Sequence, residues 1–224
     1  MNPSGLWVWH FGLPPRATDA LGRALGWPGQ GLLAAAATTS PCPGAQDGCR
    51  PVRLADRRWR CPDCGAWWSV AQVARFAAVA RYDQPVGVDV EDGRHRPGAY
   101  RRASDWIRGQ IRTDEQWTQA EALWKAAGWG QRRPVPGEIP LGDAWRCGWQ
   151  SSLDDRWWVF TAATPNPWSL ALPRTGPQPP ALNVVRQAWP VRSAGAPSGR
   201  RLRPGLPGSD DQLDPVGAGI IEGK

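Results

Sequence analysis

The sequence predicts a fold that combines β-strands with α-helices, because segments of both kinds occur along the chain. The run Val86–Glu91 is rich in valine, which is typical of a strand. The stretch Thr113–Ala127 begins with a capping residue and ends before a glycine, which is typical of a helix. At 224 residues, the chain is long enough to bury a core in one domain or in two small ones.

The elements of the first half follow from the same patterns. An Ala- and Leu-rich stretch at Thr18–Ala37 predicts a helix that is interrupted near Gly26 and Pro28. Arg75–Arg81 is a short apolar run. Together with Val86–Glu91 across a short turn, it predicts a β-hairpin.

The second half contains two helical patterns and two strand-like runs. The helices are expected at residues 99–110 and 113–127, and the strands at residues 157–161 and 168–172. Beyond Pro173 the chain is rich in Pro, Gly, Arg and Ser with almost no periodicity. This composition predicts a disordered tail over residues 174–224.

Charge and hydropathy narrow the class of protein. The formal net charge of +7 suits an anionic ligand or an acidic protein partner, but it is too weak to indicate DNA binding by itself. The longest apolar run, Leu32–Ala37, is far shorter than the roughly 20 residues of a membrane-spanning helix. The first residues lack the positively charged start of a signal peptide, so we expect a cytoplasmic protein without a membrane partner.

Two acidic side chains stand out in the valine-rich run. Residues two apart in a strand point to the same face, so Asp89 and Glu91 project together. Neighbouring carboxylates repel one another unless a cation neutralises them, and Mg²⁺ prefers such oxygen ligands. The alternative is a solvated edge strand with two acids on its wet face.

A second set of polar residues lies in the helix that follows. Trp117, Glu121 and Lys125 are spaced at i, i+4 and i+8, so they lie along one helix face. Taken alone, this spacing indicates only an amphipathic helix with a surface ion pair.

Together the two segments resemble the signature of the 4′-phosphopantetheinyl transferase superfamily, in its two-lobed, secondary-metabolism type. Residues 86–91 resemble its first motif, and residues 117–125, with the sequence WTQAEALWK, resemble its second. Ser69–Gln72 and Gly48–Pro51 are similar to two further elements of the family. The resemblance covers about residues 20–172.

The resemblance implies an α+β fold of two similar halves related by pseudo-twofold symmetry. The halves are expected at residues 1–84, which include a cysteine-containing loop at 41–66, and at residues 85–173, with the tail at 174–224. Coenzyme A would bind in the cleft between the halves.

The resemblance also implies an activity. The enzyme would transfer the 4′-phosphopantetheine arm of coenzyme A to a serine of an acyl or peptidyl carrier protein and release 3′,5′-ADP. Asp89, Glu91 and Glu121 would hold Mg²⁺, Glu91 would act as the base, and Lys125 would balance the charge of the leaving group. We expect a monomer that binds the carrier protein and coenzyme A and binds no nucleic acid.

The resemblance also implies a set of residues that bind coenzyme A. These residues are Arg50, Gln72, Trp117 and Lys125. Core packing is an equal alternative for Trp117.

Two departures from the family pattern support an alternative hypothesis. Gln72 stands where the family usually has a histidine that contacts a coenzyme A phosphate, and the connection from Glu91 to Glu121 is short. The alternative is a degenerate relative that binds coenzyme A or a carrier protein without turnover.

The cysteines support a third hypothesis from a different class. Arg60–Gly65 has the form of a zinc knuckle, which Cys42 and Cys49 could complete, while Cys147 stands apart. A zinc-ribbon nucleic-acid-binding protein is therefore a further alternative, and unligated thiols are the default interpretation. We expect the two histidines, His10 and His95, on the surface.

Overall fold

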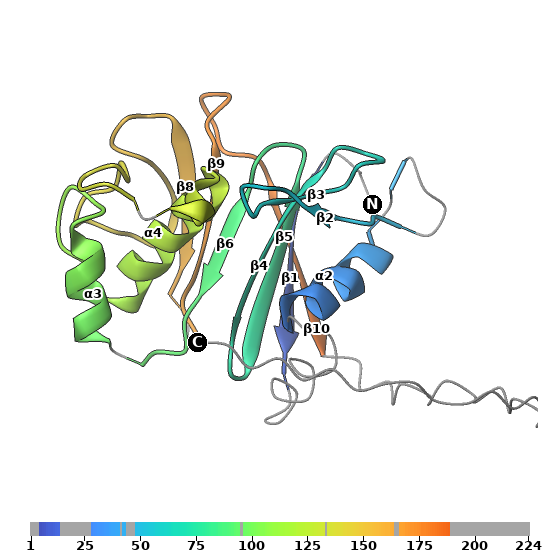
Figure 1. Ribbon diagram of the computed structural model, residues 1–224, viewed down its shortest axis with the longest axis horizontal. Helices are drawn as coiled ribbons and strands as arrows, with labels where there is room; N and C mark the ends of the chain where they lie inside the picture. The colour runs from blue at the N-terminus through green and yellow to red at the C-terminus, as the bar shows by residue number, and fades with distance from the viewer. Residues whose placement is uncertain are drawn as a thin grey trace, which may run out of the picture. The chain divides into compact units, whose positions relative to one another are not determined.

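The fold is a mixture of helices and sheets, as the sequence predicts. It is known from a computed structural model, which describes residues 5–13, 28–40, 42–43, 48–94, 96–132, 134–163 and 166–188. All of these residues belong to one compact unit, residues 1–189 (Figure 1).

The first sheet contains strands from both ends of the described chain. Their order is β10-β1-β5-β4-β3-β2; β1 and β10 run parallel, and the other neighbours run antiparallel. The strands are β1 (Leu6–Gly12), β2 (Val52–Arg53), β3 (Trp59–Arg60), β4 (Trp67–Val73), β5 (Phe76–Tyr82) and β10 (Leu182–Ala188).

The second sheet is antiparallel and has the order β6-β9-β8-β7. Its strands are β6 (Gly87–Val90), β7 (Gly148–Ser151), β8 (Trp157–Ala162) and β9 (Trp168–Pro173). The described helices are α2 (Pro28–Thr38), α3 (Pro97–Ser104), α4 (Asp114–Ala126) and the 3₁₀ turn η1 (Trp129–Gln131). Within the described ranges, no helix has the length and apolar character needed to cross a membrane.

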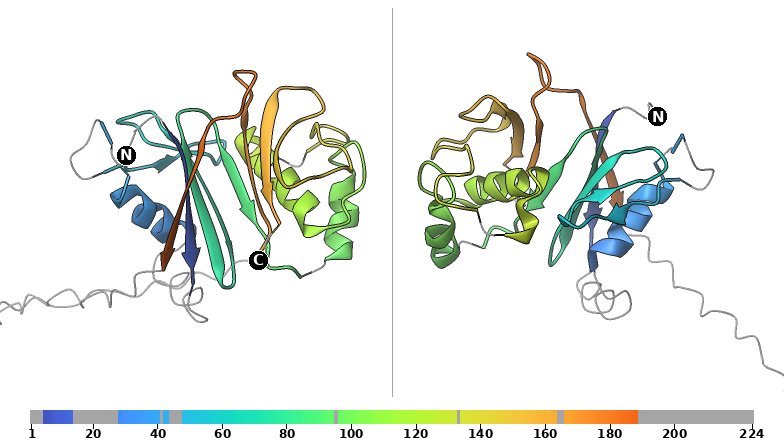
Figure 2. Two further views of the ribbon diagram at one scale, coloured as in Figure 1. Left: turned by 180° about the vertical axis from the view of Figure 1, so that it is seen from behind. Right: turned by 45° about the horizontal axis from the view of Figure 1, so that its top comes forward.

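The elements stack in layers, with the two sheets in the middle. Helix α2 covers the outer face of the first sheet, and α3 and α4 lie on the outer side of the second (Figures 1 and 2). Successive side chains of a strand point to opposite faces of its sheet, so each strand packs against the layers on both of its sides. In β5, Val79 packs toward α2, whereas Ala78 and Ala80 pack between the sheets. In β9, Leu170 packs between the sheets and Ala171 packs toward the helices.

The predicted hairpin between residues 75–81 and 86–91 is wrong. Strand β5 pairs with β4 and β1, whereas β6 pairs with β9. The chain therefore passes from the first sheet to the second between Tyr82 and Gly87. The valine-rich run is buried along its whole length because the first sheet covers one face and α4 covers the other.

The prediction of a disordered tail is wrong for its first part. Residues Leu182–Ala188 form β10, which pairs in parallel with β1. The strand satisfies the backbone groups that the edge of β1 would otherwise leave open. The rest of the tail, residues 189–224, lies outside the described residues, as does the segment 14–27 that precedes α2. Helix α2 itself begins at Pro28, near the predicted interruption.

Helix α4 is docked on the second sheet by a close backbone approach and by buried hydrogen bonds. A Cβ atom added to Gly87 would lie 1.9 Å from the carbonyl oxygen of Ala122, so only glycine fits there. Thr118 Oγ1 lies 2.8 Å from Ser169 Oγ, and Gln119 Nε2 donates to Thr161 Oγ1 over 2.8 Å. These contacts fix which face of α4 meets β6.

We expect Gly87→Ala to destabilise the protein by about 1–3 kcal/mol or more, because backbone atoms of α4 must move to accommodate the methyl group. Gly98→Ala is the matched control, since a Cβ atom there would meet its nearest neighbour, Arg102 Nη1, at an ordinary 3.9 Å. The control should change the free energy of unfolding by less than ~1 kcal/mol. Urea denaturation measures both, and equal effects would contradict the close approach.

Candidate functional site

Strand β6 turns the carboxylate of Asp89 toward helix α4, where it meets Lys125. Lys125 Nζ donates to Asp89 Oδ1 over 2.6 Å and to the carbonyl oxygen of Val88 over 3.1 Å. Asp89 is only 7% exposed, and its second oxygen, Oδ2, is buried and accepts no hydrogen bond from the described residues. The ion pair thus leaves half of this carboxylate available to a ligand.

Glu91 is the second acid of the strand and is also buried. Arg96 Nη2, at the start of α3, lies 3.1 Å from Glu91 Oε2. Burial and the neighbouring charge of Asp89 raise the pKa of Glu91 to about 7, although the Arg96 guanidinium opposes this shift. Glu91 can therefore exchange a proton near neutral pH.

The helix contributes Glu121, which is half-buried. Burial and the charge of Asp89 raise the pKa of Glu121. Burial alone would lower the pKa of Lys125, but Asp89 and Glu121 raise it, so the ammonium stays charged. The three carboxylates and Lys125 therefore form one electrostatic cluster between β6 and α4, in which negative charge exceeds positive charge.

The oxygen donors of the cluster are of the kind that Mg²⁺ prefers. Three carboxylates supply hard oxygen donors, and the buried Oδ2 of Asp89 lacks a hydrogen bond from the described residues. Among the described residues, however, the candidate ligand atoms that gather within 4.8 Å of one another are cysteine thiols and not these carboxylates. Sharing one ion therefore requires the acids to come closer together than they lie here.

A cavity of about 290 Å³ opens beside Lys125. Its wall combines cationic and aromatic side chains from the hairpin of β2 and β3, from β4 and from α4. The lining residues are Arg53, Asp56, Arg57, Arg58, Trp59, Trp68, Ser69, Val70, Val86, Trp124, Lys125 and Gly130. Guanidinium groups bind phosphates and indole rings stack on bases, so this wall suits a nucleotide.

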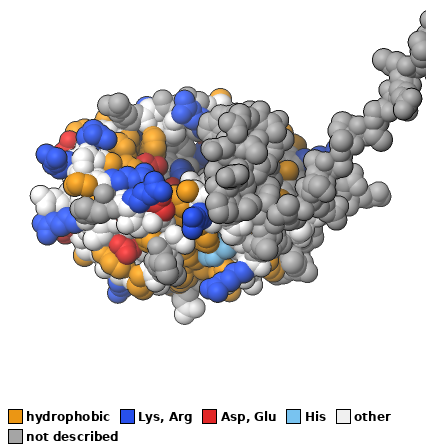
Figure 3. Space-filling view, turned by 90° about the horizontal axis from the view of Figure 1, so that it is seen from below, with side chains coloured by type: hydrophobic (Ala, Val, Ile, Leu, Met, Phe, Trp, Pro, Cys, Tyr) orange, Lys and Arg blue, Asp and Glu red, His pale blue; other side chains and the backbone are white. Residues whose placement is uncertain are grey.

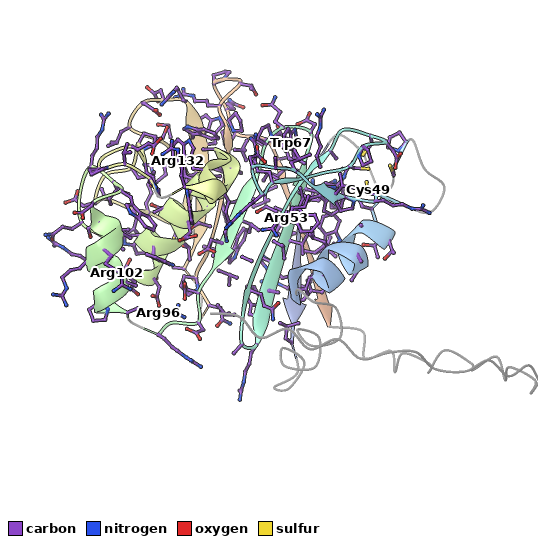
Figure 4. The ribbon with its side chains drawn as sticks, viewed as in Figure 1. Cys49, Arg53, Trp67, Arg96, Arg102 and Arg132 are labelled. Atoms are coloured by element: carbon purple, nitrogen blue, oxygen red, sulfur yellow. The ribbon has the colours of Figure 1, made fainter. Side chains whose placement is uncertain are left out.

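Arg58 joins the β2–β3 hairpin to the end of α4. Its Nη1 atom donates to the carbonyl oxygen of Ala126 over 3.3 Å, and its Nε atom donates to Asp56 Oδ2 over 2.7 Å. The guanidinium carbon also lies 4.6 Å from the centre of the Trp67 ring, which is worth about 0.5–2 kcal/mol. Arg53 and Trp67 extend from the first sheet, whereas Arg96 and Arg102 lie at α3 (Figure 4).

The predicted site residues divide into two groups. The structure brings Asp89, Glu91, Glu121 and Lys125 into one cluster. Of these four, only Lys125 is among the described residues that line the cavity. The other predicted residues, Arg50, Gln72 and Trp117, do not line it either.

Each of these three residues has another environment. Trp117 packs against Tyr100 and Trp106, with ring centres 6.2 and 6.0 Å away, which favours its packing alternative. Arg50 is exposed, and Gln72 is half-buried near the end of β4.

Sequence reasoning missed the arginines that line the cavity and the arginine that pairs with Glu91. Arg53, Arg57 and Arg58 lie close together in the sequence, and this density was the available signal. Arg96 gave no comparable signal in the sequence, because the turn that precedes α3 is what brings its side chain to Glu91.

The prediction that His10 lies on the surface is wrong. His10 is 9% exposed in β1, where its ring packs edge-on against Phe76 and Trp168. Burial and the charge of Arg186 lower its pKa to about 4, so it is neutral near pH 7. His95 lies outside the described residues.

Comparison of the chain with protein-family models and with curated proteins gives no match. The class of site therefore follows from its geometry. It is a cluster of acids with one lysine, built by a strand and a helix, beside a cavity lined by arginine and tryptophan. Such a site suits a ligand that carries both phosphates and a base.

We expect the contribution of Glu91 to the stability of the protein to fall as the pH rises from about 5 to 8. The folded protein holds the proton of Glu91 up to about pH 7, whereas the unfolded chain releases it near 4.5. This residue therefore stabilises the fold fully below about pH 4.5, and the contribution is lost as the pH rises through 7. This loss should not exceed about 3 kcal/mol, and urea denaturation across this range measures it as the difference between the unmutated protein and Glu91→Gln.

Glu91→Gln should flatten this pH dependence and stabilise the protein at pH 8. Glu138→Gln is the control, because Arg132 holds the pKa of Glu138 below its ordinary value, outside the range measured. A slope that Glu91→Gln leaves unchanged would contradict the assignment.

Proposed function

We propose that this protein is a magnesium-dependent 4′-phosphopantetheinyl transferase. The observation that carries the proposal is the meeting of Asp89 on β6 with Lys125 on α4, one helical turn from Glu121, beside a cationic and aromatic cavity. These are the acids and the lysine of the two motifs that resemble the family, and they come from separate segments of the chain.

Coenzyme A is the substrate that suits the cavity. Arg53 and Lys125 would bind phosphate oxygens through charge-assisted hydrogen bonds, and tryptophans of the wall would pack against the adenine. A volume of about 290 Å³ suits the 3′-phosphorylated ADP portion, with the pantetheine arm extending outward.

Asp89, Glu91 and Glu121 would hold Mg²⁺, which would neutralise the diphosphate and orient it for in-line attack. The raised pKa values of Glu91 and Glu121 support this assignment, because a cation at this position would relieve the repulsion that raises them.

The side chains divide the proton and charge chemistry between them. Glu91 takes the proton of the carrier serine hydroxyl as the serine oxygen bonds to the β-phosphorus. The bond from that phosphorus to the bridging oxygen breaks, and the electron pair leaves with 3′,5′-ADP. Lys125 stabilises the negative charge that develops there.

The proposal includes the two-half, pseudo-symmetric architecture of the family. The two sheets, with their own helices, would be the similar halves of the family fold, divided near residue 84, with coenzyme A between them.

The acyl or peptidyl carrier protein would dock as an acidic partner. Lys and Arg side chains are spread over the described part of the face seen from below, among hydrophobic and a few acidic ones (Figure 3). The enzyme would act as a cytoplasmic monomer.

Two alternative functions have observations of their own. The glutamine at position 72 motivates a relative that binds coenzyme A or a carrier protein without turnover. The cysteines and the arginine-rich hairpin motivate a zinc-dependent nucleic-acid-binding protein, for which binding would weaken steeply with salt. An assay of transfer to a carrier protein distinguishes the first alternative from the transferase. Nucleic-acid binding measured across a salt series distinguishes the second.

Incubation with coenzyme A, Mg²⁺ and an apo carrier protein should add the mass of one phosphopantetheine arm to the carrier, as read by mass spectrometry. Asp89→Ala and Glu121→Ala should lower the rate at least ~100-fold, because each removes a charge that the transition state needs. Glu115→Ala, on the same helix, is the control and should retain activity. Full activity of either cluster variant would contradict the metal assignment, and no transfer to any of several carriers would favour the degenerate relative.

Calorimetric titration with 3′,5′-ADP tests the cavity without a carrier protein. Arg53→Ala should weaken binding about 10-fold or more, because a charge-assisted hydrogen bond to phosphate is lost. Arg132→Ala is matched to it, since each guanidinium lies 5.8 Å from a tryptophan ring, but Arg132 does not line the cavity. Equal losses in the two variants would exclude the cavity as the nucleotide site.

A further inference from the structure

Four cysteines from two separate segments gather at one point of the first sheet. Cys42 Sγ lies 3.9 Å from Cys61 Sγ, and Cys49 Sγ lies 3.6 Å from Cys64 Sγ. All four sulfur atoms lie within 4.8 Å of one another. Figure 4 shows sulfur atoms beside the labelled Cys49, beyond the end of α2.

These distances match a tetrahedral metal site and not a pair of disulfides. A zinc ion with four Zn–S bonds of about 2.3 Å places its sulfur atoms about 3.8 Å apart. A disulfide requires about 2.05 Å, far below the observed separations. The four thiols thus already have the mutual spacing that one zinc ion requires.

The backbone of each segment is shaped to present its thiols. In the second segment, Cys61 N donates to Ala66 O over 2.8 Å and Gly65 N donates to Cys61 O over 2.9 Å. Gly65 has a φ of 73°, a conformation that favours glycine. This tight turn brings Cys61 and Cys64 to one side, as in a zinc knuckle.

The first segment reaches the same geometry with a wider spacing. Gly48 has a φ of 87°, and a Cβ atom there would lie 2.6 Å from the carbonyl oxygen of Ala37. Cys49 N donates to that same oxygen over 3.3 Å, which holds the cysteine against the end of α2. The six residues between Cys42 and Cys49, unusual for a knuckle, are therefore compatible with a closed site.

We propose that Cys42, Cys49, Cys61 and Cys64 bind one structural zinc ion. Four thiolates complete a tetrahedral shell and leave no open position for a substrate, which is the arrangement of structural zinc sites. Cys49 and Cys61 are 4% and 0% exposed, and the other two are half-buried, so water has little access.

The position of the ion indicates its role. The segment that follows Cys49 forms β2, and the segment that precedes Cys61 forms β3. The zinc ion therefore closes the base of the hairpin that carries Arg53 and Arg58 to the cavity. The site itself does not depend on the proposed transferase activity.

Metal analysis of the full-length protein tests the proposal directly. Protein purified without added chelator should contain one zinc per chain, and Cys61→Ser and Cys49→Ser should each lose it. Cys147→Ser is the matched control, because this cysteine is exposed and does not belong to the cluster. It should retain the full zinc content.

A thiol titration of the unmutated protein avoids any failure of the variants to fold. In the native protein, Cys147 should react first with a thiol reagent, and the other four should react together with the release of one zinc, detected by a zinc-binding dye. Iron in place of zinc, five thiols that react without metal release, or a mass lowered by disulfide formation would each overturn the proposal. None of these outcomes depends on transfer to a carrier protein, so the two proposals succeed or fail separately.

Discussion

The close approach of helix α4 to strand β6 is the constraint on which the candidate site depends. A glycine at position 87 lets the two backbones come within a distance that any side chain would prevent. The buried hydrogen bonds from Thr118 and Gln119 to the second sheet fix the rotation of the helix. Glu121 and Lys125 are thereby brought to Asp89, although more than thirty residues separate them in the chain.

This approach concentrates charge in a partly apolar layer, which is electrostatically unfavourable. The pKa values of Glu91 and Glu121 are raised by burial and by repulsion from Asp89, and the charges of Lys125 and Arg96 offset only part of this effect. Clusters of this kind are common at functional sites, where residues that the activity requires lower the stability of the fold. A divalent cation would offset this excess of negative charge, and for this reason it enters the proposed function.

The first sheet contributes the other wall of the site through the β2–β3 hairpin. Two strands of two residues each cannot hold such a hairpin rigidly by backbone pairing alone. Arg58 joins it to the end of α4, and the four cysteines join its base to the segment that follows α2. The position of the cationic wall thus depends on contacts at both ends of the hairpin.

The sequence by itself determined the local elements and the polarity of their faces. The alternation in residues 86–91 placed Asp89 and Glu91 on one side, and the spacing in residues 117–125 placed Glu121 and Lys125 on one helix face, because both follow from periods of a few residues. Only the tertiary structure decided which elements pair. It paired β6 with β9, brought Leu182–Ala188 to β1, buried His10, and placed Cys42 and Cys49 beside Cys61 and Cys64. These contacts connect residues far apart in the chain, and they depend on how whole faces pack together, which no local pattern encodes.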